Sequence, residues 1–182
     1  MTSVEFASGK SVPLETIAQV FRDAFTSSEG KTEGELIAQL AHNLMKDTAS
    51  NDLRVYVAQS ESDVVACVMF SRLDFRQDLR NIWLLSPLAV LTAHQNQSVG
   101  SGLIRYALSC LLQEGVDAVF TYGDPNFYQR VGFVYVDQTV AKAPFDLSMP
   151  EGWLVVSLSS QAFSPIQGES QCVQALRDSK YW

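Results

Sequence analysis

The chain has 182 residues, 47% of them hydrophobic, and a formal net charge of −7 at pH 7. This length suits one substantial core and no linker-like stretch divides it, so we predict a single domain over residues 1–182, with a core at about 4–158 and a C-terminal extension at 159–182. The thirteen Lys and Arg residues are spread along an acidic chain, which argues against nucleic-acid binding because that activity depends on clustered positive charge.

Cysteine and histidine positions argue against disulfides and metal sites. Cys67, Cys110 and Cys172 are odd in number and far apart, so neither a disulfide framework nor a Cys-x-x-Cys site is available. His42 and His94 have no second ligand-type residue at metal-binding spacing. The first residues lack the features of a secretory signal, and no apolar run approaches the ~18 residues that a membrane span needs. We therefore expect a cytoplasmic protein that binds neither membrane nor metal.

The first half of the chain predicts a strand, two helices and three further strands. Apolar residues recur at helical spacing after Pro13 and again before Ser50, and alternating or continuous apolar runs follow. The run from Val64 to Phe70 is apolar on both faces, as in a strand that is covered from both sides. In chain order we predict a strand over 4–7, helices over 17–25 and 33–46, and strands over 54–58, 64–75 and 81–90.

The second half predicts a helix over 99–114 that Gly115 closes, a strand over 118–122 and a short helix from Asp124-Pro125. Strands over 133–136 and 153–158 follow, whereas the segment around Cys172 could be strand or helix. The order is β-α-α-β-β-β-α-β-α-β-β, which indicates an α/β (α+β) fold. A doubly wound nucleotide-binding fold would alternate strand and helix and carry its glycine loop after the first strand. In this chain the glycine loop follows the fourth predicted strand.

The loop between the fourth predicted sheet strand and the long helix is typical of an anion site. It contains Gly100 and Gly102 and opens directly into the helix. The N–H groups in the first turn of a helix have no intrahelical partner, and the peptide dipoles add partial positive charge there. A phosphate group is the expected ligand. A nucleotide-binding switch is excluded because the Lys-Ser/Thr of a P-loop is absent.

Three segments in this order resemble the GNAT superfamily of N-acetyltransferases, and in particular a small bacterial branch of it. They are Leu-Ser-Pro-Leu-Ala-Val at 85–90, Gln-Asn-Gln-Ser-Val-Gly at 95–100 and Gly-Asp-Pro-Asn-Phe-Tyr-Gln-Arg-Val-Gly-Phe at 123–133. The resemblance implies the GNAT fold, with a single mixed, mostly antiparallel central sheet of about seven strands flanked by about four helices. It also implies acetyl-CoA as co-substrate.

The resemblance further implies where the cofactor binds. The strand before the loop would offer its backbone to the pantetheine and the thioester carbonyl, and the loop amides would hold the pyrophosphate. Ser98 departs from the family pattern, because the first glycine of the signature stands at this position in relatives. Serine tolerates a left-handed backbone less well than glycine, so we expect weakened but not abolished cofactor binding. The residues concerned are Leu88, Ala89, Val90, Gln95, Asn96, Gln97, Ser98, Val99, Gly100, Ser101 and Gly102.

Tyr128 is the candidate general acid, because relatives place a tyrosine near the CoA sulfur on the short helix after the next strand. The alternative is a packed aromatic side chain beside Phe127 and Phe133. Asp124 could be taken for a general base, but its position before Pro125 is that of a helix N-cap.

We therefore expect an acyl-CoA-dependent N-acyltransferase that transfers acetyl to a primary amine of a small molecule or peptide by direct attack in a ternary complex. The alternative is a catalytically degenerate acyl-CoA-binding module or sensor. Turnover with a panel of amines separates the two hypotheses. The sequence leaves open which amine accepts the acetyl group, and whether the chain is a monomer or a homodimer.

Overall fold

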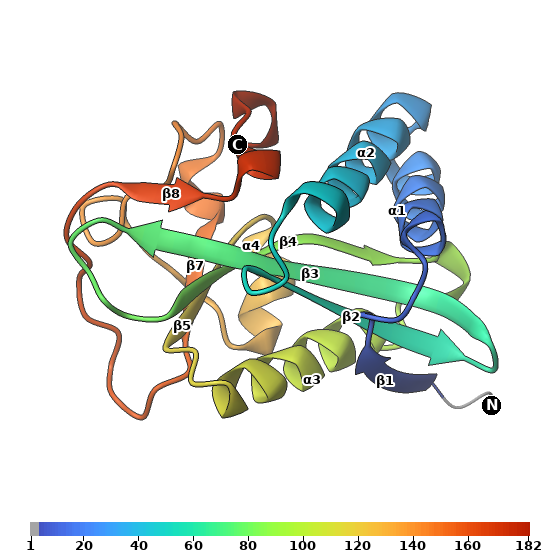
Figure 1. The fold of residues 1–182 in the computed structure, drawn as a ribbon, viewed down its shortest axis with the longest axis horizontal. Coiled ribbons are helices and arrows are strands. Elements are labelled where there is room, and N and C mark those ends of the chain that lie inside the picture. The colour runs from blue at the N-terminus through green and yellow to red at the C-terminus, as the bar shows by residue number, and fades with distance from the viewer. Residues whose placement is uncertain (1–3) are drawn as a thin grey trace. The chain divides into compact units, whose positions relative to one another are not determined.

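The structure of the chain is a computed structural model that describes residues 4–182. Residues 1–3, which belong to the N-terminal segment expected to lack a secretory signal, lie outside this range. The elements follow the predicted order, with short 3₁₀ turns between them (Figure 1). They are β1 (Val4–Ser8), α1 (Leu14–Glu29), α2 (Lys31–Asp47), β2 (Leu53–Ser60), β3 (Asp63–Phe75), β4 (Ile82–Val90), α3 (Val99–Gln113), β5 (Ala118–Tyr122), α4 (Pro125–Tyr128), β6 (Val134–Tyr135), β7 (Trp153–Ser157) and β8 (Ser170–Cys172).

The strands form a mixed, mostly antiparallel sheet, as expected. They pair in the order β1-β2-β3-β4-β5-β7-β6, and β8 pairs with β3. The parallel pair is β4 with β5, the two strands that the crossover helix α3 connects. The sheet has eight strands rather than about seven, because β8 forms in the segment around Cys172 that the sequence left undecided.

The described residues group into two compact units. The first contains residues 4–70 and Pro87–Ala107, and the second contains Ser71–Ser86 and Leu108–Trp182. Strands β3 and β4 and helix α3 contribute residues to both. The single domain over 1–182 stays a prediction, and each unit is described by itself below.

In the first unit, α1 and α2 pack side by side at very close range (Figure 1). Their buried faces follow the predicted apolar stripes, with Ile17 and Phe21 on α1 and Leu40 and Leu44 on α2. The close approach depends on Gly34 in α2. A Cβ atom at Gly34 would lie 2.8 Å from the carbonyl oxygen of Arg22 in α1, so no larger residue fits without separating the helices.

In the second unit, aromatic side chains form the core around β5. The ring of Phe120 stacks on Trp153 of β7 at a centroid distance of 4.9 Å and meets Phe163 edge-on at 5.7 Å. Trp182 stacks on Tyr122 at 6.2 Å and donates its Nε1–H to the Leu176 carbonyl. These contacts pack the segment after β7 against β5.

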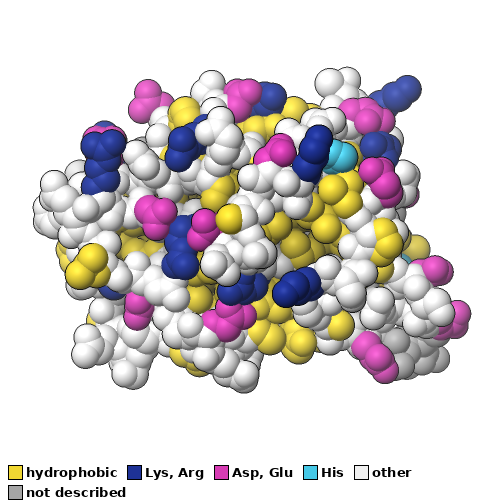
Figure 2. All heavy atoms as spheres, viewed as in Figure 1, with side chains coloured by type: hydrophobic (Ala, Val, Ile, Leu, Met, Phe, Trp, Pro, Cys, Tyr) yellow, Lys and Arg dark blue, Asp and Glu magenta, His cyan; other side chains and the backbone are white. Residues whose placement is uncertain are grey.

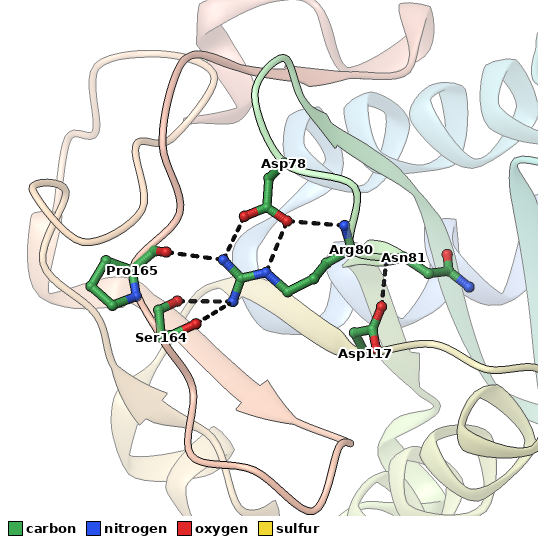
Figure 3. A network of polar contacts seen from close by, with 6 residues as sticks. All are labelled: Asp78, Arg80, Asn81, Asp117, Ser164 and Pro165. Atoms are coloured by element: carbon green, nitrogen blue, oxygen red, sulfur yellow. Dashed lines mark hydrogen bonds and ion pairs between the residues drawn. The ribbon is translucent and has the colours of Figure 1, made fainter.

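Polar contacts also hold this segment. Arg80, after the turn that follows β3, is paired with Asp78 at 2.6 Å and donates from its guanidinium to the carbonyls of Ser164 and Pro165 (Figure 3). The hydrogen bond from Arg80 holds the pKa of Asp78 below its ordinary value. Because the folded-state pKa is lowered, this pair stabilises the fold near neutral pH, and the stabilisation is lost as the pH falls through that pKa.

Charged side chains are mixed on the surface, and Figure 2 shows Lys and Arg lying among Asp and Glu on one face. No helix between residues 4 and 182 has the length and apolarity needed to cross a bilayer. Over the same residues, His, Cys, Asp and Glu side chains form no group of three that could hold a metal ion.

Candidate functional site

The turn between β4 and α3 has an unusual backbone. Asn96 and Ser98 have φ angles of 59° and 62°, in the left-handed region that favours glycine. Gln97 between them is not left-handed. Successive N–H groups in turns with left-handed residues form concave sites that bind anions. Ser98 thus adopts the conformation that a glycine would adopt at the same place.

Hydrogen bonds from side chains hold this turn in shape. Gln95 Nε2 donates to the Val90 carbonyl at 2.9 Å, and Gln97 Nε2 donates to the Ala93 carbonyl at the same distance. Ser101 Oγ donates to the carbonyl of Ser98 at 3.1 Å. The side chains of the two glutamines therefore stabilise the conformation of the turn.

The N–H groups of the turn fall into two sets. Those at its ends are already bonded, since Gln95 N–H donates to the Thr92 carbonyl and Gly102 N–H donates to the Ser98 carbonyl at 2.9 Å. The first turn of α3, starting at Val99, is where a helix leaves its N–H groups without intrahelical partners. An anion would therefore be bound by the middle of the predicted loop rather than by its two ends.

Gly102 has a separate packing role. A Cβ atom at this position would lie 2.7 Å from Cζ of Phe6 on β1, which belongs to the same unit. The absence of a side chain at Gly102 lets α3 approach β1 closely. The sequence offered no signal that separates this role from phosphate binding.

Strand β4 extends beyond its pairing with β5. The parallel register runs from Ile82 opposite Ala118 to Leu85 opposite Thr121, while β4 continues to Val90. At the end of β4 the chain stays bonded to β3, because Leu91 N–H donates to the Val65 carbonyl at 2.9 Å. The backbone of residues 88–90 thus lies past the last pair with β5, where a strand can still offer main-chain groups to a ligand.

The short helix α4 begins as the sequence predicts. Asp124 is its N-cap, and its Oδ1 accepts from the Asn126 backbone N–H at 2.9 Å, with Pro125 at the first helical position. The interpretation of Asp124 as a cap is confirmed.

Tyr128, the last residue of α4, is held on several sides. Its ring meets Phe127 and Phe133 edge-on at centroid distances of 5.1 and 5.5 Å. A Cβ atom at Gly123 would lie 2.8 Å from Cε2 of Tyr128, so this glycine makes room for the ring. Burial raises the pKa of Tyr128 to about 12, although its hydrogen bond with Thr121 opposes the rise. The phenol therefore carries its proton near neutral pH.

Two neighbours of Tyr128 were missed as functional candidates. Gly123 belongs to the quoted Gly-Asp-Pro segment, but its steric role follows only from the position of the ring. Thr121 is an ordinary β-branched residue in an apolar strand, and the sequence carries no signal for it.

Residues 51–135 match the family described as "Acetyltransferase (GNAT) domain". Over these residues the chain is similar to a GNAT acetyltransferase domain. The matched residues run from β2 to β6 and therefore include the β4–α3 turn and the α4 helix.

A curated GNAT relative is the "Uncharacterized N-acetyltransferase YhbS" of Escherichia coli strain K12. It is 34% identical over 103 residues, which make up 56% of this chain and 60% of the relative. The match thus spans less than two thirds of the relative's own length.

Solved GNAT structures share the fold over nearly the whole chain. The crystal structure of YhbS from Escherichia coli in complex with CoA has a TM-score of 0.83 at 22% identity, covering 98% of this chain and 94% of the other. A GNAT family acetyltransferase from Brucella melitensis in complex with acetyl-CoA has a TM-score of 0.71 at 20% identity, covering 96% and 99%. These likenesses confirm the GNAT fold.

The left-handed backbone of Ser98 in the β4–α3 turn yields a stability prediction. Replacing Ser98 by glycine removes a strain of about 1–2 kcal/mol, and the greater flexibility of glycine offsets part of this gain. We expect the Ser98→Gly variant to be more stable by about 1 kcal/mol, which thermal denaturation would show as a rise of about 2–4 °C in Tm. Gln97→Gly is the matched control and should lower Tm. A lower Tm for Ser98→Gly would contradict the strain.

Gly123 yields a prediction about the neighbouring tyrosine. Its φ lies outside the left-handed region, so alanine is compatible with the backbone, but the added methyl group would meet the Tyr128 ring. We expect Gly123→Ala to displace this ring while the chain still folds. Ring NMR signals of labelled tyrosine would report the shift, and an unchanged Tyr128 signal would contradict it. Gly115→Ala cannot serve as control because Gly115 is left-handed, whereas the exposed Ser109→Ala in α3 can.

Proposed function

We propose that this chain is an acyl-CoA-dependent N-acyltransferase that transfers acetyl from acetyl-CoA to a primary amine of a small molecule or peptide. The observation that carries the proposal is the β4–α3 turn, in which two non-glycine residues, Asn96 and Ser98, hold the left-handed conformation of an anion-binding loop. We place the activity in the cytoplasm, as expected from the sequence.

The chain offers two main-chain surfaces to the cofactor. The N–H groups between Asn96 and Ser101 suit the diphosphate, because they combine the concave turn with the start of α3. The backbone of Leu88, Ala89 and Val90 suits the pantetheine and the thioester carbonyl, since β4 runs beyond its last pair with β5. The Val90 carbonyl already accepts from Gln95 Nε2 and is therefore less available for this role.

Acetyl-CoA supplies a thioester that an amine can attack directly. In this mechanism the N–C bond forms as the C–S bond breaks, the amine proton passes to solvent, and the leaving thiolate needs a proton. Tyr128 is the proposed donor of that proton, because its raised pKa keeps the phenol protonated near neutral pH. Solvent then restores the proton to the phenolate.

Calorimetric titration with acetyl-CoA, followed by thiol release with an amine panel, tests the proposal. The panel contains polyamines, aminoglycosides, amino acids and peptides with free N-termini. Binding with thiol release is the expected result. Absence of acetyl-CoA binding would refute the proposal, and binding without release from any amine would favour the acyl-CoA-binding sensor.

A variant that adds a negative charge to the β4–α3 turn tests whether the diphosphate of acetyl-CoA binds there. Gln97→Glu places a carboxylate on the exposed turn without needing a left-handed backbone, and its charge opposes that of a diphosphate. We expect weaker acetyl-CoA binding for this variant, most strongly at low salt. The matched control is Gln113→Glu at the other end of α3, which should bind like the wild type. Equal affinities for both variants would place the diphosphate elsewhere. The weakening expected from Ser98 stays a prediction, which Ser98→Gly tests in the same titration.

A further inference from the structure

The side chain of Gln95 connects the two parts of the candidate cofactor site. Gln95 stands at the start of the β4–α3 turn, one residue before the left-handed Asn96. Its Nε2 reaches back to the carbonyl of Val90, the last residue of β4, at 2.9 Å. Both residues belong to the first unit. Gln95 therefore contacts the end of β4, which we assign to the pantetheine, and adjoins the turn that we assign to the diphosphate.

The backbone at Gln95 is held independently of this side-chain contact. Its N–H donates to the Thr92 carbonyl at 3.2 Å, and His94 N–H donates to the Leu91 carbonyl at 2.8 Å. Leu91 is in turn bonded to β3 through its own N–H. All these bonds remain when the Gln95 side chain leaves Val90, so the side chain can move while the turn keeps its place.

Exchange of the donor at the Val90 carbonyl costs little. The Gln95 side chain is exposed, so water can replace a lost partner, and the net contribution of a neutral hydrogen bond is small for that reason. Pantetheine contains secondary amides, whose N–H groups can donate to the same carbonyl. One neutral hydrogen bond then replaces another, and the Val90 carbonyl still accepts from a donor.

The released amide gains a better partner when a diphosphate is bound. Gln95 Nε2 carries two N–H donors, and a hydrogen bond to a charged phosphate oxygen is about twice as strong as a neutral one. Because Gln95 is the chain neighbour of Asn96, a rotation of its side chain is sufficient to redirect the amide from Val90 to an anion at the turn. The exchange is therefore most favourable when pantetheine and diphosphate are bound together.

We propose that Gln95 couples the two parts of the cofactor site, by donating to the Val90 carbonyl in the free protein and to the diphosphate once a pantetheine N–H has taken that carbonyl. No covalent bond changes in this exchange. The inference rests on the proposed acyl-CoA-dependent function. It requires that pantetheine and pyrophosphate, added as separate molecules, each strengthen the binding of the other, because coupling between two sites is reciprocal.

The first test follows the side-chain amide of Gln95 by NMR. In protein labelled with ¹⁵N-glutamine, its Nε2 signal is assigned by its loss in Gln95→Met, which keeps a long side chain without a donor. We expect both pantetheine and acetyl-CoA to shift this signal. Pantetheine should leave the signal of Gln97, which donates to the Ala93 carbonyl, in place. Bound acetyl-CoA with an unmoved Gln95 signal would overturn the proposal.

The second test measures the coupling itself. The affinity for inorganic pyrophosphate is titrated with and without saturating pantetheine, which is uncharged and so has no direct electrostatic effect on the anion. We expect pantetheine to strengthen pyrophosphate binding by about fivefold, at the lower end of typical couplings, and Gln95→Met to abolish this ratio. Gln97→Met is the matched control, because it removes a donor of the same kind at the same distance from its carbonyl. It should keep the ratio even where it changes each affinity.

The outcomes separate this inference from the function on which it rests. Wild-type protein that binds neither acetyl-CoA nor the two fragments would refute the acyltransferase and the coupling together. Independent binding of the fragments, or a coupling that persists in Gln95→Met, would overturn the role of Gln95 while the acyltransferase stands. If the fragments bind too weakly to titrate, the Gln95 signal with acetyl-CoA decides.

Discussion

Tyr128→Phe is expected to lower kcat for acetyl transfer by about 10²-fold, at the lower end of the range for loss of a general acid. The substitution removes only the hydroxyl, so the ring contacts with Phe127 and Phe133 remain. Because the raised pKa lies far above neutral pH, the wild-type phenol is protonated throughout the working range, and the loss should be seen at every pH from 6 to 9. Initial-rate measurements of thiol release give the result.

The matched control is Tyr135→Phe on β6, where the tyrosine is exposed and its hydroxyl donates to Asp137. It should keep the wild-type kcat. Acetyl-CoA affinity should be unchanged in both variants. If Tyr128→Phe turns over as fast as the control while still binding the cofactor, the tyrosine is only a packed aromatic residue.

Gly34→Ala is expected to destabilise the first unit by about 2 kcal/mol, which is a typical cost of overpacking. The added Cβ would meet the Thr26 side chain and would also lie 2.8 Å from the Arg22 carbonyl oxygen and 2.9 Å from the Thr26 backbone nitrogen. Alanine has the higher helix propensity by about 1 kcal/mol, so a net loss would show that the helix contact dominates. Denaturation followed by circular dichroism at 222 nm measures the change.

Two further variants define the cause. Thr32→Ala, at an exposed position on the same helix, should leave stability nearly unchanged. Thr26→Ala combined with Gly34→Ala removes the side-chain clash but leaves both backbone clashes, so the double variant should stay destabilised. Full recovery in the double variant would mean that the two backbones can separate at little cost.

The sequence predicted the elements and the anion loop because both depend on local signals. Apolar periodicity marks the helices, and Gly100 with the following helix marks the loop. The placement of Ser98 at a glycine position of the signature also led to a physical expectation, a left-handed backbone, and its φ of 62° agrees. The role of Asp124 as a helix N-cap before Pro125 could also be predicted, because capping involves residues that are neighbours along the chain.

Other features depend on contacts between distant segments and could not be read from local patterns. The steric need for glycine at position 102 comes from Phe6, almost a hundred residues away. The hydrogen bond from Thr121 Oγ1 to the Leu85 carbonyl joins β5 to β4, although the residue looks like any core threonine. Strand β8 exists because it pairs with β3, and its own three residues carry too little pattern to predict it.

The positions of the tryptophans have a practical consequence for experiments on the two units. Trp83, Trp153 and Trp182 are all buried and all belong to the second unit. Indole fluorescence therefore reports the loss of structure in that unit alone, whereas ellipticity is dominated by helices, including α1 and α2 of the first. Coincident melting curves from the two probes would indicate one cooperative transition. Separated curves would reveal an intermediate in which one of the two units has already unfolded.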